Sequence, residues 1–132
     1  MRWLKTAVQI SCPLPLITGA MDLVLGARVL SATGAALPAE ALSDPVLNSQ
    51  IRFWGAIWFG FGVVLWVVAR DLHANALWFR LLCGVLFLSG IGRAVSMLQF
   101  GLPSPPLIGA TALELVGIPV LLWWHSNALR KS

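Results

Sequence analysis

The stretch VLNSQIRFWGAIWFGFGVVLWVVA, residues 46–69, decides the fold class of this chain. It is long and apolar, and Arg52 is its single charged residue. A helix needs about 20 apolar residues to cross the hydrocarbon core of a bilayer. Three more stretches of this kind lie near residues 7–30, 75–99 and 106–125. The sequence therefore predicts an all-α integral membrane protein with four transmembrane helices.

The composition of the whole chain supports this prediction. The 132 residues are 58% hydrophobic and 11% charged, and the mean hydropathy is +0.84, whereas soluble domains are nearer about 45–50% apolar. The net charge of +4 comes with no basic run of the kind that follows nucleic-acid phosphates. We therefore expect a single membrane domain over residues 1–132 and no nucleic-acid partner.

The distribution of charge predicts the topology. Four spans place both termini on one side of the membrane, and the basic residues that would gather on that side are Arg2, Lys5, Arg70, Arg80, Arg130 and Lys131. The opposite side would carry Glu40 and Asp44. Because positive residues favour the cytoplasmic side, we expect both termini in the cytoplasm. Five tryptophans near the same helix ends indicate the same orientation; they are Trp3, Trp66, Trp78, Trp123 and Trp124.

The loops between the spans predict how the helices are connected. The longest loop, residues 31–45, ends with Asp44 placed to cap a helix that has Pro45 at its first position. The loop Gly-Leu-Pro-Ser-Pro at residues 101–105 breaks the chain between the third and fourth spans. Short connections of this kind favour an antiparallel four-helix bundle.

Five ionisable residues lie inside the apolar stretches or at their rims: Asp22, Arg28, Arg52, Arg93 and Glu114. Each costs several kcal/mol in a bilayer, so their presence points to pairing, water or a ligand. At about 1.5 Å per residue, Asp22, Arg93 and Glu114 fall at a similar depth. We therefore expect a polar layer in the outer half of the bundle, supported by Ser89, Ser96, Gln99 and Thr111.

Small residues near these charges predict where helices touch. The pairs Ala56 with Gly60 and Gly92 with Ser96 have the four-residue spacing that lets membrane helices approach closely.

Three interpretations of the polar layer remain open. In the first, an acid pairs with an arginine of another helix and holds the bundle together. In the second, the layer lines a cavity for an anionic headgroup, because three arginines against two acids leave one positive charge over. In the third, Asp22 and Glu114 carry a proton or an ion.

Other chemistry-bearing residues lack the spacing of a known site. Cys12 and Cys83 fall in apolar stretches and are expected to be packing residues. His73 and His125 have no partner at metal-ligand spacing, so we expect them at the membrane interface, with no metal and no cofactor. Pro119 either kinks the fourth helix below Glu114 or is tolerated there without consequence.

Two stretches carry a resemblance to a known family: NSQIRFWGAIWFGFG, residues 48–62, and GRAVSMLQFGLPSPPLIGATALELVGIPVLL, residues 92–122. They resemble the bacterial four-span membrane proteins grouped as domain of unknown function 4345. The residues at matching positions are Arg52 with Gly60 and Gly62, Arg93, and Glu114. Gly55 is followed here by Ala56, where the family pattern has a glycine pair. The resemblance implies a multi-pass protein of the bacterial cytoplasmic (inner) membrane and supplies no activity.

The sequence leaves three classes of function open. No Ser-His-Asp set, phosphate loop or CxxC motif is present, which favours a non-enzymatic module that binds a lipid or a lipophilic anionic metabolite, or scaffolds a membrane enzyme or a second copy. The alternative is an enzyme acting on a lipophilic substrate, with Glu114 or Asp22 as acid or base and Arg93 or Arg52 stabilising negative charge. The third is an oligomeric transporter of protons or small anions.

Overall fold

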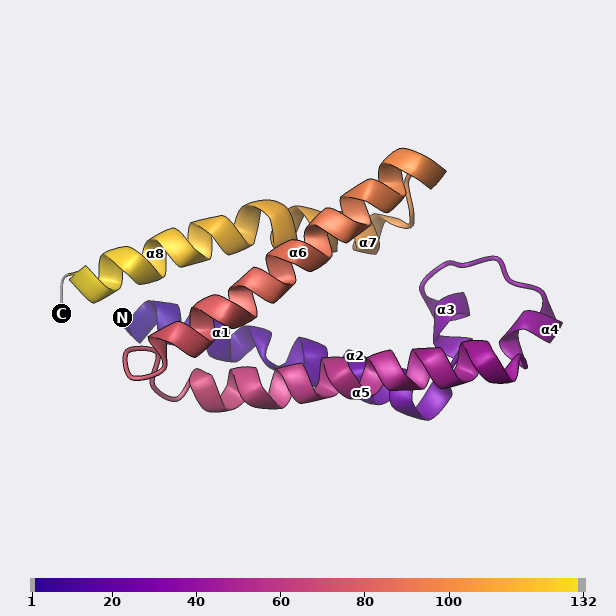
Figure 1. Ribbon diagram of the computed structural model, residues 1–132, viewed down its shortest axis with the longest axis horizontal. Helices are drawn as coiled ribbons and strands as arrows, with labels where there is room; N and C mark the ends of the chain where they lie inside the picture. Colours follow the sequence, from indigo (N-terminus) through magenta and orange to yellow (C-terminus); the bar gives the residue numbers. More distant parts are fainter. Residues whose placement is uncertain (1, 131–132) are drawn as a thin grey trace. The chain divides into compact units, whose positions relative to one another are not determined.

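The computed structural model describes residues 2–130, and all regular secondary structure in that range is helical. The elements are α1 (Arg2–Ser11), α2 (Pro13–Leu25), α3 (Arg28–Ala32), α4 (Ala39–Leu42), α5 (Pro45–Val68), α6 (Ala76–Phe100), α7 (Pro105–Ala112), the π-helical turn η1 (Leu113–Gly117) and α8 (Ile118–Arg130) (Figure 1). Among them are four helical segments long and apolar enough to cross a membrane: Arg2–Leu25, Pro45–Val68, Ala76–Phe100 and Pro105–Arg130. The predicted all-helical chain with four such segments is confirmed. Lys131, one of the basic residues used for the topology, lies outside the described residues.

The first segment begins and ends earlier than the predicted range 7–30. It ends at Leu25 because Gly26 has a φ of +57°, a conformation that glycine adopts without a Cβ penalty. The Gly26 N–H still bonds the carbonyl of Asp22 at 3.0 Å. Arg28 therefore lies in the short helix α3 and not at the end of the long helix.

The same segment is interrupted at Cys12, between α1 and α2. Pro13 has no N–H to continue the helical ladder, and Pro15 follows closely. Cys12 instead bonds to residues that precede it. Its N–H bonds the Gln9 carbonyl at 3.3 Å, and its Sγ lies 3.3 Å from the Val8 carbonyl. The prolines thus divide the first segment into two helices.

The start of α5 is as the sequence predicted. Pro45 is its first residue, and Asp44 Oδ1 accepts the N–H of Leu47 at 2.7 Å. This side chain satisfies one of the N–H groups that the first turn of a helix leaves unpaired.

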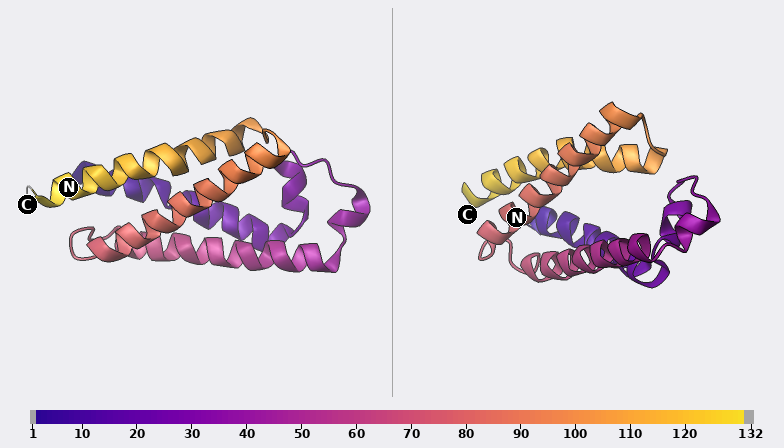
Figure 2. Two further views of the ribbon diagram at one scale, coloured as in Figure 1. Left: turned by 45° about the horizontal axis from the view of Figure 1, so that its top comes forward. Right: turned by 45° about the vertical axis from the view of Figure 1, so that its right-hand side comes forward.

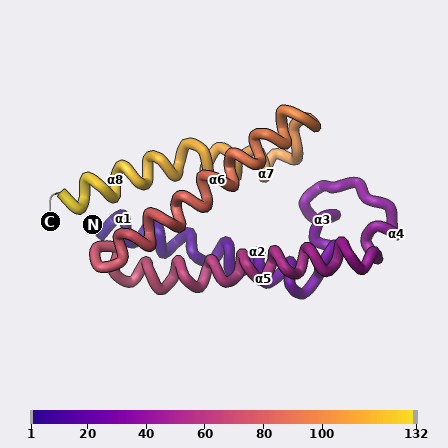
Figure 3. Tube along the Cα trace, viewed as in Figure 1, coloured from indigo at the N-terminus to yellow at the C-terminus, as the bar shows by residue number. Residues whose placement is uncertain are grey.

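The described residues form two compact units, one of which is Val8–Val67. In this unit α2 and α5 run in opposite directions, and the connection between them contains α3 and α4 (Figure 3). A Cβ added to Gly19 would lie 2.5 Å from the backbone N of Phe59, and one added to Gly62 would lie 3.0 Å from the side chain of Leu16. Close backbone approach at small residues therefore holds this helix pair.

The other unit contains the N-terminal residues up to Ala7 and the residues from Val68 onward. Its main feature is a hairpin in which α6 runs against α7, η1 and α8 (Figure 2). Gly101, with a φ of +92°, ends α6, and α7 resumes at Pro105, so the predicted break and close hairpin are confirmed.

Within each unit, the predicted small-residue pairs do not mediate these contacts. In the described residues, a Cβ added to Gly60 or Gly92 would meet no atom within 4 Å, and Ala56 and Ser96 are exposed. Which side of a helix packs depends on its rotation, and spacing along the chain does not specify that rotation.

Both cysteines are buried and free, as expected for packing residues.

Candidate functional site

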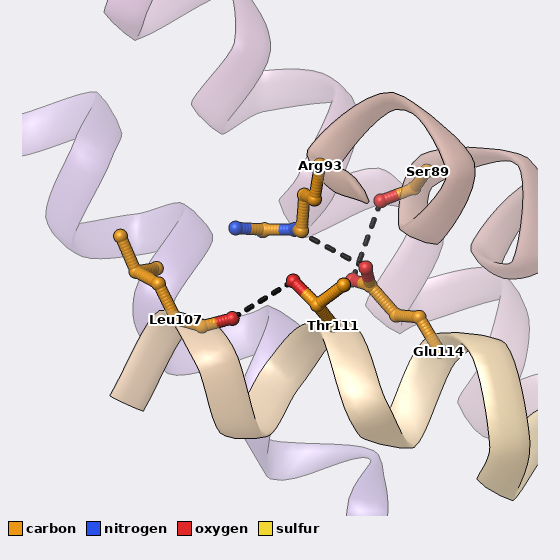
Figure 4. Close-up of polar contacts among 5 residues, drawn as sticks. All are labelled: Ser89, Arg93, Leu107, Thr111 and Glu114. Atoms are coloured by element: carbon orange, nitrogen blue, oxygen red, sulfur yellow. Dashed lines mark hydrogen bonds and ion pairs between the residues drawn. The ribbon is translucent and has the colours of Figure 1, made fainter. Parts of the chain in front are cut away.

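The centre of the candidate site is an ion pair between α6 and η1. Arg93 Nε lies 3.2 Å from Glu114 Oε2. Ser89, one turn before Arg93 on α6, donates its hydroxyl to Glu114 Oε1 at 3.3 Å (Figure 4). The Glu114 side chain is 12% exposed and the Arg93 side chain 41%. The glutamate side chain is therefore largely enclosed, whereas the arginine side chain is exposed to a greater extent.

The arginine engages the carboxylate through one nitrogen only. Within residues 2–130, neither Nη atom of Arg93 makes a hydrogen bond or a further ion pair. Figure 4 shows the far end of the guanidinium group pointing away from Glu114. In the described part of the chain, two nitrogens in the fixed fork that suits phosphate or carboxylate oxygens are thus left without a partner.

Gly90 permits the close approach that forms this pair. A Cβ at this position would lie 2.7 Å from Glu114 Cβ and 3.1 Å from the side chain of Leu115. Carbon atoms pack at about 3.5–4.0 Å, so any larger residue would push η1 away from α6. Ser89 and Arg93 flank this glycine, and the contact therefore brings both side chains to the carboxylate.

Glu114 lies in the π-helical turn itself. The N–H of Ile118 bonds the carbonyl of Leu113, five residues back, where an α-helix would reach four residues back. Pro119 follows immediately; it has no N–H, and in an α-helix its ring would crowd the carbonyl of Leu115. The wider turn gives the ring room, as local π adjustments do in membrane helices. Pro119 is thus accompanied by altered helix geometry, and turns of this kind are frequent at functional sites.

The other predicted supporting residues do not reach the pair. Thr111 is buried, but its hydroxyl bonds the Leu107 carbonyl of its own helix at 2.9 Å (Figure 4). Ser96 and Gln99 are exposed, and neither side chain has a hydrogen-bonding partner in the part of the chain that the structure describes.

Arg52 contacts the end of α2. It donates from Nη1 to the backbone carbonyl of Leu23, in the last turn of α2. Helix ends leave carbonyls unpaired and carry partial negative charge, so a guanidinium there is favourable. In the Val8–Val67 unit, Arg52 thus caps the end of the first long segment.

Asn48 completes this cap and was missed by the sequence analysis. Its Oδ1 accepts the N–H of Ala27 at 3.0 Å, and its Nδ2 donates to the carbonyls of Leu42 and Asp44 at 2.9 and 3.0 Å. A signal existed, because Asn48 precedes Arg52 by four residues and therefore shares its helix face.

Asp22 and Arg28 are not joined to an ion pair in residues 2–130. The Cβ of Asp22 packs against α5 at Gly55, where an added Cβ would lie 2.5 Å away. Arg28 is exposed in α3. A polar layer through all four long segments stays a prediction, since Asp22, Arg28 and Arg52 belong to one unit and the Arg93–Glu114 pair to the other.

His125 is fully buried. Its expected place at the membrane interface stays a prediction. Its Nε2 lies 3.2 Å from the Leu72 carbonyl, and its ring packs on Phe79 with centroids 4.7 Å apart. The fourth long segment continues to Arg130, beyond the predicted end near residue 125. The histidine links the loop before α6 to α8.

The chemistry available at the pair follows from these contacts. A carboxylate, a guanidinium and a hydroxyl offer an acceptor and donors for a polar group, and they sum to zero net charge. No group of three or more His, Cys, Asp or Glu side chains that could hold a metal occurs within residues 2–130.

Comparison with protein families identifies one match. Residues 3–125 match the family described as domain of unknown function (DUF4345), which confirms the resemblance of the sequence to that family. No match is found among curated proteins or among solved structures.

Proposed function

The chain belongs to the family described as domain of unknown function 4345, and we propose that it is a multi-pass membrane module that binds a lipid or lipophilic metabolite through Arg93. The observation that carries the proposal is the single-nitrogen contact between Arg93 and Glu114. The carboxylate fixes the arginine and offsets its charge, while both Nη groups lack a hydrogen-bond partner within residues 2–130. A phosphate or carboxylate of a ligand would complete their hydrogen bonds.

The proposal includes the location of the protein. We place it in the bacterial cytoplasmic membrane as an antiparallel four-helix bundle with both termini in the cytoplasm. The basic residues that bracket the apolar segments support this orientation. The Arg93–Glu114 pair then falls in the outer half of the membrane.

Copurifying lipids test the proposal directly. Wild type, Arg93→Gln and Gln99→Ala are purified in one mild detergent, and the retained lipids are quantified by mass spectrometry. Gln99 is the matched control, because it lies on the same helix, is exposed and makes no side-chain hydrogen bond or ion pair in the described residues. Losing a charged hydrogen bond costs about 1.5–3 kcal/mol, so Arg93→Gln should reduce the retained ligand about tenfold or more. Equal retention by all three proteins would exclude this function.

An enzyme that uses the same pair is the second candidate. The π-helical turn that carries Glu114 favours it, because such turns recur at active sites. In that case Glu114 would transfer a proton and Arg93 would stabilise the developing negative charge. A deletion strain with unchanged lipid and quinone profiles would argue against this alternative.

A further inference from the structure

The charge balance at the pair restricts the ligand beyond the general class of lipophiles. Arg93 and Glu114 are 3.2 Å apart and cancel, and in residues 2–130 no second ion pair adjoins them. A ligand with a net charge would therefore leave that charge uncompensated in a low-dielectric setting, which is costly. A ligand with both a positive and a negative group leaves the site neutral.

The carboxylate also lacks strong donors. Glu114 Oε2 is buried, faces Arg93 and accepts no hydrogen bond of good geometry. Among the described residues, its Oε1 accepts only the hydroxyl of Ser89, at 3.3 Å. Hydroxyl-to-carboxylate bonds are usually about 2.5–2.7 Å, so this one is weak and easily replaced. Ser89 is exposed, and a ligand donor can thus reach the Oε1 edge.

The ion pair has two edges that a ligand could contact. One edge presents the Nη groups of Arg93, which need acceptors. The other presents Oε1 of Glu114, which can take a better donor than Ser89 (Figure 4). Taking this site to be the lipophile site of the proposed function, we propose that its ligand is zwitterionic, with an anionic phosphate oxygen bound by Arg93 and an adjacent N–H donor, a primary ammonium, bound by Glu114.

Phospholipids with matched acyl chains test this assignment. Delipidated protein in detergent is titrated with dioleoyl phosphatidylethanolamine, phosphatidylcholine or phosphatidylglycerol, and bound lipid is counted by native mass spectrometry. Phosphatidylcholine keeps the phosphate and positive charge but has no N–H. Phosphatidylglycerol keeps the phosphate but has a net negative charge. Phosphatidylethanolamine can make one charged hydrogen bond that phosphatidylcholine cannot, so it should bind about tenfold more tightly.

Variants of the pair separate the two proposals. Glu114→Gln should remove the preference for ethanolamine over choline, whereas Arg93→Gln should weaken all three lipids by a similar factor. Gln99→Ala lies on the same helix outside the pair and should retain the ethanolamine preference. If Glu114→Gln does not fold, Glu114→Asp is the readout: it keeps the charge but shortens the side chain, so the preference should fall, and an undiminished preference would count against ligand contact at Oε1.

The outcomes are distinct. Equal binding of ethanolamine and choline lipids, or tighter binding of phosphatidylglycerol, would overturn the zwitterionic assignment and leave lipophile binding intact. Lipid binding that does not respond to Arg93→Gln would overturn the proposed function itself. Soluble phosphoethanolamine is added as a competitor. If it displaces bound phosphatidylethanolamine at a concentration equal to that of the lipid, the headgroup chemistry is supported and the ligand is assigned as water-soluble. If displacement requires a large excess, the same headgroup chemistry is supported and the ligand is assigned as a lipid.

Discussion

Replacing Gly90 with alanine would place a methyl group at the closest contact between α6 and η1. The added Cβ would lie 2.7 Å from Glu114 Cβ, about 1 Å inside the normal carbon contact distance. The two elements must separate by roughly that amount or distort. Overpacking of this kind costs about 1–3 kcal/mol.

The separation would also stretch the ion pair. The Arg93 Nε to Glu114 Oε2 distance of 3.2 Å would grow to about 4.2 Å, and at an effective dielectric constant of about 20 this removes about 1 kcal/mol of attraction. We therefore expect Gly90→Ala to lose about 2–4 kcal/mol in total.

Gly92→Ala is the matched control on the same helix. Its added Cβ meets no atom within 4 Å, so its effect should stay within about 0.5 kcal/mol. Helix propensity should contribute little to either variant, because separated transmembrane segments remain helical in the bilayer.

The assay is reversible unfolding in mixed micelles, followed by tryptophan fluorescence. Lipid retention by the two variants reports on the site itself and should fall only in Gly90→Ala. The reasoning is refuted if both glycine variants lose the same stability, or if Gly90→Ala unfolds like the wild type.

Three further predictions concern residues outside the ion pair. Arg52→Met removes the cap on the end of α2, so hydrogen exchange should accelerate at the amides just after Leu25. Arg52→Lys can still donate a hydrogen bond and should protect these amides better than Arg52→Met. Unchanged exchange in both variants would show that the cap contributes nothing. His125→Phe keeps the packed ring but leaves the Leu72 carbonyl unpaired, which should cost about 1–3 kcal/mol in the same unfolding assay, and a variant as stable as wild type would contradict that hydrogen bond. Asp71 lies in the loop before α6, and the backbone N–H of Ala74 is the main cause that lowers the pKa of its carboxyl, aided by a further N–H and nearby positive charges. A carboxyl whose pKa is lowered on folding stabilises the protein at pH values above its unfolded pKa of about 3.9, and this stabilisation is lost as pH falls through the folded pKa. Asp71→Asn should therefore lose less stability on acidification than wild type. Parallel pH profiles of the two proteins would refute this.

Local features of this protein were predictable from the sequence because they depend on neighbours along the chain. The four apolar segments follow from hydropathy summed over contiguous residues. The start of α5 follows from Asp44 and Pro45, whose roles require only the next turn of the helix. The break after Phe100 follows from the glycine and prolines of its loop.

The partners of the intramembrane charges could not be predicted in the same way. The sequence allowed either acid to pair with either Arg52 or Arg93, since depth along a helix says nothing about its rotation. The structure pairs Glu114 with Arg93 and assigns Arg52 to a carbonyl of α2.

The sequence by itself determined that the chain is helical, apolar enough to span a membrane, and carries costly charges in those segments. Only the tertiary structure decided which glycine lets two helices meet, and so which charges face each other. Gly90 is in contact and Gly92 is not, although they are two residues apart, because successive residues on a helix point in different directions. The rotation that selects Gly90 is set by packing between helices, a property of the folded molecule that no single segment contains.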